Sequence, residues 1–197
     1  MNGKLGTLIR VEPATPERWS DAAIVFESDG PRGCWCQYWR QSSSGYGAGG
    51  PGSGERRLRA QVDGGPPAPG LIAYDENVPA GWLGLGPRGS MERLVRSRTI
   101  PGIDEVPVWS IVCFKVRVGH RRKGVARALL DAAIDYAASQ GAPALEAYPV
   151  DAEGDRLDVA FSYVGFASMF EAAGFERIVE TAARSAGRPR ILMRLAL

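Results

Sequence analysis

The amino-acid sequence predicts a single domain of the α/β class. Its 197 residues fall within the size range of one domain, and 45% of them are apolar, which is enough to form a buried core. Strand-like and helix-like patterns alternate along the chain. The clearest pattern lies between residues 108 and 140, where a β-branched stretch leads through a basic turn into an amphipathic helix.

The first half of the chain contains three expected strands and two expected helices. Thr15 is a suitable N-cap, and Pro16 occupies the favoured first helical position of the first helix. The expected elements are a strand at 7–11, a helix at 16–26, a short basic helix at 55–62, and strands at 71–74 and 80–85 joined by a hairpin turn.

Residues 41–54, Q-S-S-S-G-Y-G-A-G-G-P-G-S-G, form a segment of low complexity. A segment of this composition cannot pack a core, so we expect a flexible Gly/Ser-rich loop. Residues 87–104 also read as irregular, with one helical turn near 92–96.

Residues 116–126, V-R-V-G-H-R-R-K-G-V-A, indicate a phosphate-binding turn. The start of a helix leaves several backbone N–H groups unpaired, and the helix dipole favours negative charge there. The following helix has apolar residues at three- and four-residue spacing, and Gly141 and Pro143 end it. The alternative interpretation is a simple strand–turn–helix connection with solvated arginines.

Two common nucleotide motifs are excluded for this turn. A Walker A loop requires Gly-Lys-Ser or Gly-Lys-Thr, which the sequence lacks, and Gly119 and Gly124 do not have the spacing of a dinucleotide fingerprint. The motif Arg121-x-x-Gly124-x-Ala126 instead resembles the Q/R-x-x-G-x-G/A loop of the GNAT acetyltransferase superfamily, which binds the pyrophosphate of acetyl-CoA.

The resemblance extends over about residues 7–196. A strand at 108–118 precedes the loop, a strand at 144–148 follows its helix, and S-M-F-E-A-A-G-F at 168–175 is similar to the family's L-Y-x-x-x-G-F element. Strands at 177–182 and 190–196 fit the end of the fold. The resemblance implies one GNAT domain over 1–197, with a mixed twisted sheet of about six to seven strands and helices on both faces.

The resemblance also implies the donor and its site. Acetyl-CoA would be the co-substrate, without a metal, and the strand ending at Val116 would splay from the next parallel strand. Pantetheine would contact the main chain of Phe114, Lys115 and Val116. The pyrophosphate would be surrounded by Arg121, Arg122, Lys123, Gly124, Val125, Ala126 and Arg127.

The catalytic groups are less clearly marked. Glu146 is the candidate general base, with Tyr148 on the same strand face, although a solvated or salt-bridged glutamate is an equally open interpretation. Phe170 stands where the family often places a tyrosine that protonates the CoA thiolate. Tyr163 or Tyr148 could take that role, or the thiolate, with a pKa of roughly 8–9, could leave unprotonated.

Residues 33–40, G-C-W-C-Q-Y-W-R, are unusually rich in cysteine and aromatic residues. A C-W-C segment of this kind resembles one in an uncharacterised bacterial branch of the family. We expect Trp35 and Trp39 to form a wall of the acceptor site, because tryptophan offers flat apolar area and cation–π contact to an amine. The cysteines of this segment and Cys113 are expected to be buried as small apolar residues. A zinc site completed by the single histidine is disfavoured by the C-x-C spacing.

The composition of the chain indicates its cellular location and the classes of partner to expect. The formal net charge is +2, with acidic and basic residues mixed, so we expect no nucleic-acid partner. No apolar run approaches the ~18 residues of a membrane span, residues 1–10 lack a signal-peptide core, and three cysteines do not suggest a disulfide framework. We therefore expect a cytoplasmic protein without a membrane partner.

The expected function is transfer of acetyl from acetyl-CoA to a primary amine by direct attack. The amine would belong to a small molecule, or to a protein lysine or N-terminus. The alternative is a non-catalytic acyl-CoA-binding sensor module. The resemblance also makes a homodimer one expected assembly. The sequence does not specify the acceptor.

Overall fold

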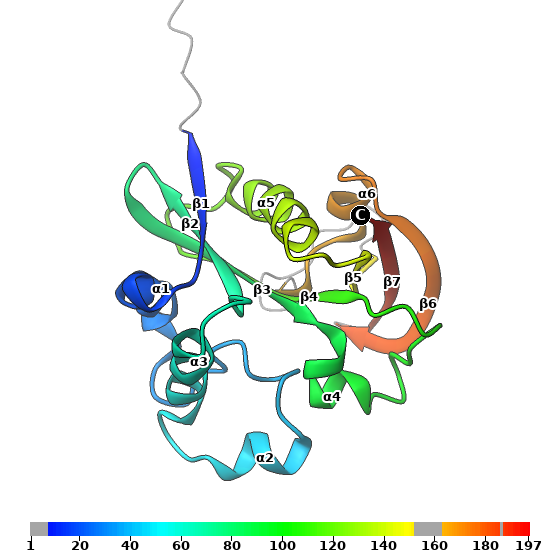
Figure 1. Ribbon diagram of the computed structural model, residues 1–197, viewed down its shortest axis with the longest axis horizontal. Helices are drawn as coiled ribbons and strands as arrows, with labels where there is room; N and C mark the ends of the chain where they lie inside the picture. The colour runs from blue at the N-terminus through cyan, green and yellow to red at the C-terminus, as the bar shows by residue number, and fades with distance from the viewer. Residues whose placement is uncertain (1–7, 152–162, 186) are drawn as a thin grey trace, which may run out of the picture.

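The computed structural model describes residues 8–151, 163–185 and 187–197. Within them the chain forms one seven-stranded mixed sheet in the order β1-β2-β3-β4-β5-β7-β6 (Figure 1). Only the β4–β5 pair is parallel among these neighbours. The strands are β1 Ile9–Pro13, β2 Gly70–Asp75, β3 Val78–Pro87, β4 Trp109–Val116, β5 Ala144–Ala147, β6 Glu176–Ser185 and β7 Arg188–Ala196.

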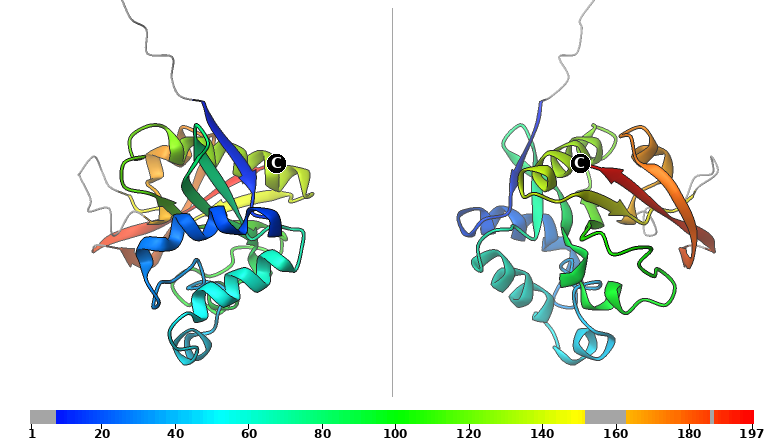
Figure 2. Two further views of the ribbon diagram at one scale, coloured as in Figure 1. Left: turned by 90° about the vertical axis from the view of Figure 1, so that its left-hand side faces the viewer. Right: turned by 45° about the vertical axis from the view of Figure 1, so that its right-hand side comes forward.

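Helices cover both faces of the sheet, as expected (Figure 2). The α-helices are α1 Trp19–Phe26, α2 Ser43–Ala48, α3 Ser53–Asp63, α4 Glu92–Val95, α5 Val125–Ser139 and α6 Ala167–Glu171. Short 3₁₀ turns occur at Pro16–Arg18, Glu27–Asp29 and Arg88–Ser90. None of the helices in the described ranges is both long and apolar enough to cross a membrane.

The core is divided between the two faces. One buried cluster joins α5 and α6 to the sheet through Leu129, Ala133 and Phe170. The second joins α1, α3 and α4 to the opposite face, with Phe26, Leu58 and Trp82 among its members. The amphipathic pattern predicted for 125–140 therefore buries its apolar stripe on the sheet, and Gly141 ends that helix with φ of +74°.

Strand β4 contains a bulge that decides which of its side chains face the later site. Gly84 of β3 lies opposite Cys113, but the next residue, Leu85, lies opposite Ile111. The extra residue shifts the alternation, so Ile111 and Phe114 both join the α5 cluster, whereas Val112 joins the cluster on the other face.

Strands β4 and β5 separate after a short contact. They pair only from Trp109 to Ile111, opposite Leu145 to Ala147, whereas β4 continues to Val116 beside β3. Within the described part of the chain, the β5-facing edge of residues 112–116 consequently has no strand partner. This is the splay between parallel strands that the resemblance implied.

The segment 41–54, which the sequence predicts to be a flexible loop, contains a short helix. Residues Ser43–Ala48 form α2, and Ser42 caps it by accepting a hydrogen bond from Gly45 N at 3.0 Å. Arg57 of α3 donates to Gly45 O at 2.8 Å. The segment lacks its own core, but polar contacts from neighbouring elements specify its conformation. Thr15 begins the first helix without a side-chain cap to the backbone.

Candidate functional site

A cavity of about 790 Å³ lies where β4 separates from β5 and meets the start of α5. Its lining residues form two groups. The donor group comprises residues of β4 and the turn before α5, and the acceptor group comprises residues from 26–46 and 163–169. The donor group contains Cys113, Phe114, Lys115, Val116, Arg117, Val118, His120, Arg121, Arg122, Gly124, Val125, Ala126 and Arg127. It includes all of the predicted cofactor residues except Lys123.

Phe114, Lys115 and Val116 line the cavity from the part of β4 that no longer pairs with β5. The side chain of Phe114 points away into the core and meets Phe170 edge-on, with ring centroids 6.0 Å apart. Its backbone still borders the cavity, on the strand edge that β5 leaves unpaired. Unpaired N–H and C=O groups on a strand edge can pair with another extended amide-bearing chain.

The turn before α5 has the geometry of an anion site. Gly124 is the N-cap of α5, with φ of +85° and no side chain capping the first helical N–H groups. Arg122 also lies in the left-handed region, with φ of +60°, and it has no ion-pair partner within the described ranges. A 15-residue helix dipole and nearby guanidinium groups therefore meet on the same turn.

Lys123 is the exception among the predicted cofactor residues. Its Nζ binds Asp75 Oδ2 at 2.9 Å, and His120 Nδ1 binds the same oxygen at 2.7 Å. Lys123 does not line the cavity. Both contacts join the turn to the end of β2, so Lys123 fixes the turn in place instead of facing the cavity.

The acceptor group is mainly aromatic. Trp35 lines the cavity and stacks on Phe26 with ring centroids 5.0 Å apart. Tyr38, Tyr46 and Phe166 add further aromatic surface. Asp29 is the carboxylate among the lining residues, and it forms an ion pair with Lys115 Nζ. Apolar rings beside one carboxylate suit an amine with an apolar body.

Trp39 is not part of this wall. It is buried in the core cluster of α1 and α3, and the guanidinium of Arg190 lies 5.2 Å from its ring centroid. The two tryptophans differ because the chain reverses between them: Trp35 and Cys36 have φ of +46° and +59°. Only Trp35 remains a candidate acceptor contact.

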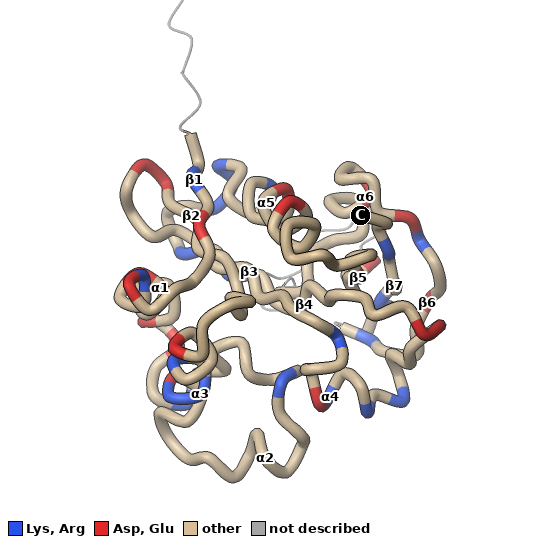
Figure 3. The backbone as a smooth tube through the Cα atoms, viewed as in Figure 1, with Lys and Arg blue, Asp and Glu red and all other residues tan. Residues whose placement is uncertain are grey.

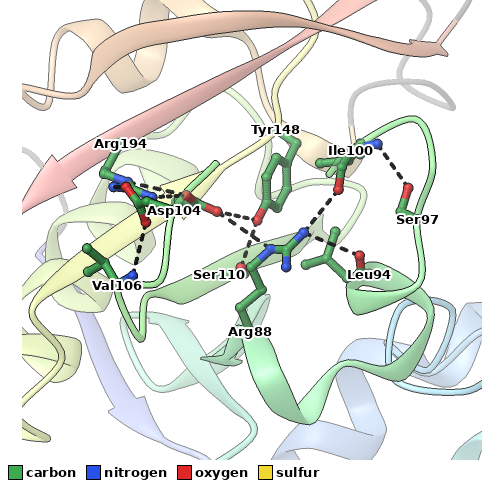
Figure 4. A network of polar contacts seen from close by, with 10 residues as sticks. Arg88, Leu94, Ser97, Ile100, Asp104, Val106, Ser110, Tyr148 and Arg194 are labelled. Atoms are coloured by element: carbon green, nitrogen blue, oxygen red, sulfur yellow. Dashed lines mark hydrogen bonds and ion pairs between the residues drawn. The ribbon is translucent and has the colours of Figure 1, made fainter. Parts of the chain in front are cut away.

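Glu146 and Tyr148 lie in a buried polar network away from the cavity lining (Figure 4). Arg194 Nη2 binds Glu146 Oε1 at 2.6 Å, and Tyr148 Oη donates to Glu146 Oε2 at 2.8 Å. Arg88 Nε lies 3.8 Å from the same carboxylate, whose side chain is 1% exposed. Burial and the Glu146 charge raise the pKa of Tyr148. The geometry corresponds to the salt-bridged glutamate that the sequence left open.

Tyr163 lines the cavity, whereas Phe170 does not. Phe170 is fully buried and packs edge-on against Phe175, at 5.1 Å between ring centroids. A tyrosine hydroxyl is protonated at neutral pH at its ordinary pKa of about 10, and burial raises the pKa of Tyr163 further. Of the two tyrosines considered from sequence, Tyr163 is therefore the one placed to donate a proton into the cavity.

No group of three or more His, Cys, Asp and Glu side chains within residues 8–151, 163–185 and 187–197 is arranged to hold a metal ion. In the described part of the chain, Lys and Arg are interspersed with Asp and Glu along the backbone (Figure 3). His120, considered from sequence as a fourth zinc ligand, binds Asp75 instead.

Several lining residues were not expected from sequence: Phe26, Asp29, Tyr46, Phe166 and Met169. Tyr46 had one available signal, because it is the only aromatic residue in the low-complexity segment 41–54. Asp29 carried no signal, since it follows the first helix as an ordinary surface residue would.

A comparison with protein families identifies the chain. A model described as the acetyltransferase (GNAT) family matches residues 20–161, which is more than half of the 197 residues. The chain belongs to this family. No curated protein matches this GNAT-family chain.

Solved structures of GNAT proteins share the fold over nearly the whole chain. The NatC complex bound to Gag peptide and CoA has a chain that is 16% identical, with 96% and 98% of the two chains covered and a TM-score of 0.55. Drosophila melanogaster polyamine N-acetyltransferase is 10% identical, covers 96% and 100%, and has a TM-score of 0.56. Ribosomal-protein-alanine N-acetyltransferase from Brucella melitensis is 17% identical, covers 95% and 99%, and has a TM-score of 0.57.

Proposed function

We propose that this GNAT-family chain transfers acetyl from acetyl-CoA to a primary amine by direct attack. One observation carries the proposal: the unpaired edge of β4, the uncapped start of α5 and an aromatic acceptor wall border one cavity. Related structures support both acceptor types, since NatC is bound to a peptide and the Drosophila enzyme forms N-acetylagmatine. The acceptor amine would belong to a small molecule, or to a protein lysine or N-terminus.

The donor would lie along residues that this geometry makes available. The backbone of Phe114, Lys115 and Val116 would pair with the pantetheine amides, and the start of α5 with Arg122 would bind the pyrophosphate. Both contacts use main-chain N–H groups held rigid by the sheet and helix, which orients the thioester without reorganisation.

Proton transfers would involve groups that line the cavity. Asp29, which lines the cavity and forms an ion pair with Lys115, would receive the proton of the attacking amine. Tyr163 would protonate the departing CoA thiolate. Glu146 would act indirectly, because Arg194 and Tyr148 occupy its carboxylate outside the cavity lining.

A non-catalytic acyl-CoA sensor is the second candidate. Two features favour it. Phe170, at the usual acid position, is buried and has no proton to donate. Glu146, at the usual base position, is held in an ion pair outside the cavity lining. A sensor would bind acetyl-CoA and leave every amine unmodified.

Turnover distinguishes these two candidates. The protein is mixed with acetyl-CoA and a panel of peptides, polyamines and aromatic amines, and the release of CoA thiol is measured. We expect release with at least one amine, and a roughly 10²-fold lower kcat in Tyr163→Phe and Asp29→Asn. Asp63→Asn is the matched control, since Asp63 pairs with Arg59 on α3 away from the cavity. Binding without turnover across the panel would favour the sensor.

We also propose a cytoplasmic location for the protein. The three cysteines are free thiols, and reduced thiols are typical of the cytoplasm.

A further inference from the structure

Three cysteines line the cavity, and none is used by the proposed transfer. Cys34 and Cys36 come from the segment between α1 and α2, and Cys113 comes from β4. Cys36 is 4% exposed. Free cysteines usually pack as small apolar residues, so their arrangement decides whether these have chemistry of their own.

The backbone is strained where it presents Cys36. Trp35 and Cys36 are consecutive non-glycine residues in the left-handed region, with φ of +46° and +59°. A non-glycine residue in this region is strained and is retained only where the surroundings require it. The strained turn places the Cys36 sulfur on the surface of β3.

Gly84 provides the space that the sulfur occupies. A Cβ atom at Gly84 would lie 2.2 Å from Cys36 Sγ and 3.5 Å from Cys113 Cβ. Gly84 is also the cross-strand partner of Cys113. The β4 bulge directs Cys113 to the same face of the sheet, so the two cysteines lie side by side. Residues distant in sequence thus form a thiol pair that no sequence pattern marks.

The surroundings favour a thiolate on Cys36. A hydrogen bond from the Cys113 thiol lowers the pKa of Cys36, and the charge of Arg40 acts in the same direction against burial. The indole N–H of Trp82 has no oxygen or nitrogen acceptor and lies 3.2 Å from the same Gly84 Cβ position. The hydrogen bond to Cys36 and burial both raise the pKa of Cys113. The pair therefore holds one nucleophilic sulfur beside one protonated thiol.

We propose that Cys36 and Cys113 are a peroxide-sensitive dithiol, which hydrogen peroxide or an alkyl hydroperoxide converts to a disulfide. The Cys36 thiolate attacks one peroxide oxygen, the O–O bond breaks, and Cys36 becomes a sulfenic acid while hydroxide or alkoxide leaves. The Cys113 sulfur then attacks Cys36 sulfur, the S–S bond forms and the S–O bond breaks. The leaving hydroxide takes the Cys113 proton, so two thiols are oxidised and one peroxide is reduced.

The disulfide would alter the acceptor group of the cavity. Its formation draws Cys36 onto Cys113 at about 2.05 Å between sulfurs and moves Trp35, the adjacent aromatic wall. Lys115, two residues beyond Cys113, holds Asp29 in the same region. Oxidation would therefore reduce acetyl transfer more than acetyl-CoA binding. This consequence rests on the proposed function, but the thiol chemistry does not.

Cys34 is an internal control for the pair. Burial raises its pKa, so it remains a thiol at neutral pH. It lines the same cavity and is more exposed than Cys36. If peroxide oxidises Cys36 in preference to Cys34, the cause would therefore be the pairing of Cys36 with Cys113 and not the access of the reagent to the cavity.

Thiol mapping tests the proposal on the full chain. The protein is treated with one equivalent of hydrogen peroxide at about pH 7, free thiols are alkylated, and peptides are identified by mass spectrometry before and after dithiothreitol. We expect a reducible link between the Cys36 and Cys113 peptides, with Cys34 alkylated. The link should be absent in Cys36→Ser and Cys113→Ser and retained in Cys34→Ser.

Two results would overturn the inference: a link that includes Cys34 in preference to Cys113, or no link together with three alkylated cysteines. A second measurement covers variants that do not fold. In the untreated wild-type protein, iodoacetamide should label Cys36 at a lower pH than Cys34, and the reverse order would contradict the thiolate. If peroxide treatment lowered turnover without forming a disulfide, that result would bear on the proposed acetyl transfer and not on the thiol pair.

Discussion

At the residue scale, Asp75 shows how a site can depend on a side chain outside it. Its carboxylate holds both Lys123 and His120, which belong to the turn that borders the cavity. The resemblance to the GNAT loop implied that Lys123 would surround the pyrophosphate together with its neighbours in the basic turn. The partner is Asp75 at the end of β2, and only folding brings this strand end close to the turn.

Asp75→Asn should loosen the turn and change the acid stability of the protein. The Lys123 hydrogen bond, followed by that of His120, lowers the pKa of Asp75. The folded state therefore favours the ionised carboxylate, and its contribution to stability is present above about pH 4 and lost as the pH falls through the folded pKa. Urea unfolding between about pH 6 and pH 3 should show a steeper acid loss for the wild type than for Asp75→Asn.

The exposed Asp63→Asn variant is the control for this measurement. Its ion pair with Arg59 is solvent-exposed, so it should leave the pH dependence nearly unchanged. Parallel curves for wild type and Asp75→Asn would refute the role given to Asp75.

At the element scale, the strand–turn–helix unit was predictable and the bulge was not. The helix of residues 125–139 follows from apolar spacing and the stop at Gly141, which are local properties. The extra residue in β4 depends on how β3 and β4 pair, and no local pattern marks it. The direction of Cys113, and thus the thiol pair, could not be derived from sequence.

The segment 41–54 shows a helix that its local composition did not predict. Its composition predicts an irregular loop, and its residues contribute little apolar surface. The Ser42 cap, the Arg57 contact and the position of Arg93 over the Tyr46 ring, at 5.5 Å, nevertheless hold α2. Tertiary contacts override weak local propensity here, which is why Tyr46 in the cavity lining was missed.

Gly124→Ala tests the turn as an element. Gly124 has φ of +85° with open space where a Cβ atom would lie, so the substitution should cost about 1–2 kcal/mol through backbone strain. It also adds a methyl group where the pyrophosphate would approach the backbone. Gly119→Ala is a matched control, with φ of +90°, open space and no place in the cavity lining.

Both glycine variants should show a similar fall in unfolding free energy by denaturant titration. Only Gly124→Ala should raise the Kd for acetyl-CoA, by roughly 10-fold or more in calorimetry, which corresponds to about 1.4 kcal/mol. Equal affinities for the two variants would argue against a ligand at this turn.

At the scale of the whole molecule, the network around Glu146 joins the two halves of the sheet. Arg194 of β7 binds both Glu146 of β5 and Asp104 of the long connection before β4. Arg88 adds hydrogen bonds to the carbonyls of Leu94 and Ile100 (Figure 4). The resemblance made Glu146 a candidate base, because some family members place an acid on that strand. The sequence gives no sign of its arginine partners.

Glu146→Gln separates a structural role from general-base catalysis. If the network is structural, the unfolding free energy should fall by about 3 kcal/mol, since buried arginines lose their counter-charge. The kcat of the folded fraction should then change little, with an unaltered pH profile. A roughly 10²-fold or larger loss in kcat with unchanged stability would instead identify Glu146 as the base.

We propose that the cavity beside the splayed strands binds acetyl-CoA through the start of α5. Isothermal titration of the protein with acetyl-CoA tests it, with Arg122→Glu as the site variant and Arg59→Glu as the control on α3. We predict saturable one-to-one binding that Arg59→Glu preserves and Arg122→Glu weakens by roughly 10-fold or more. The absence of binding at millimolar acetyl-CoA, or equal weakening by both variants, would contradict the account.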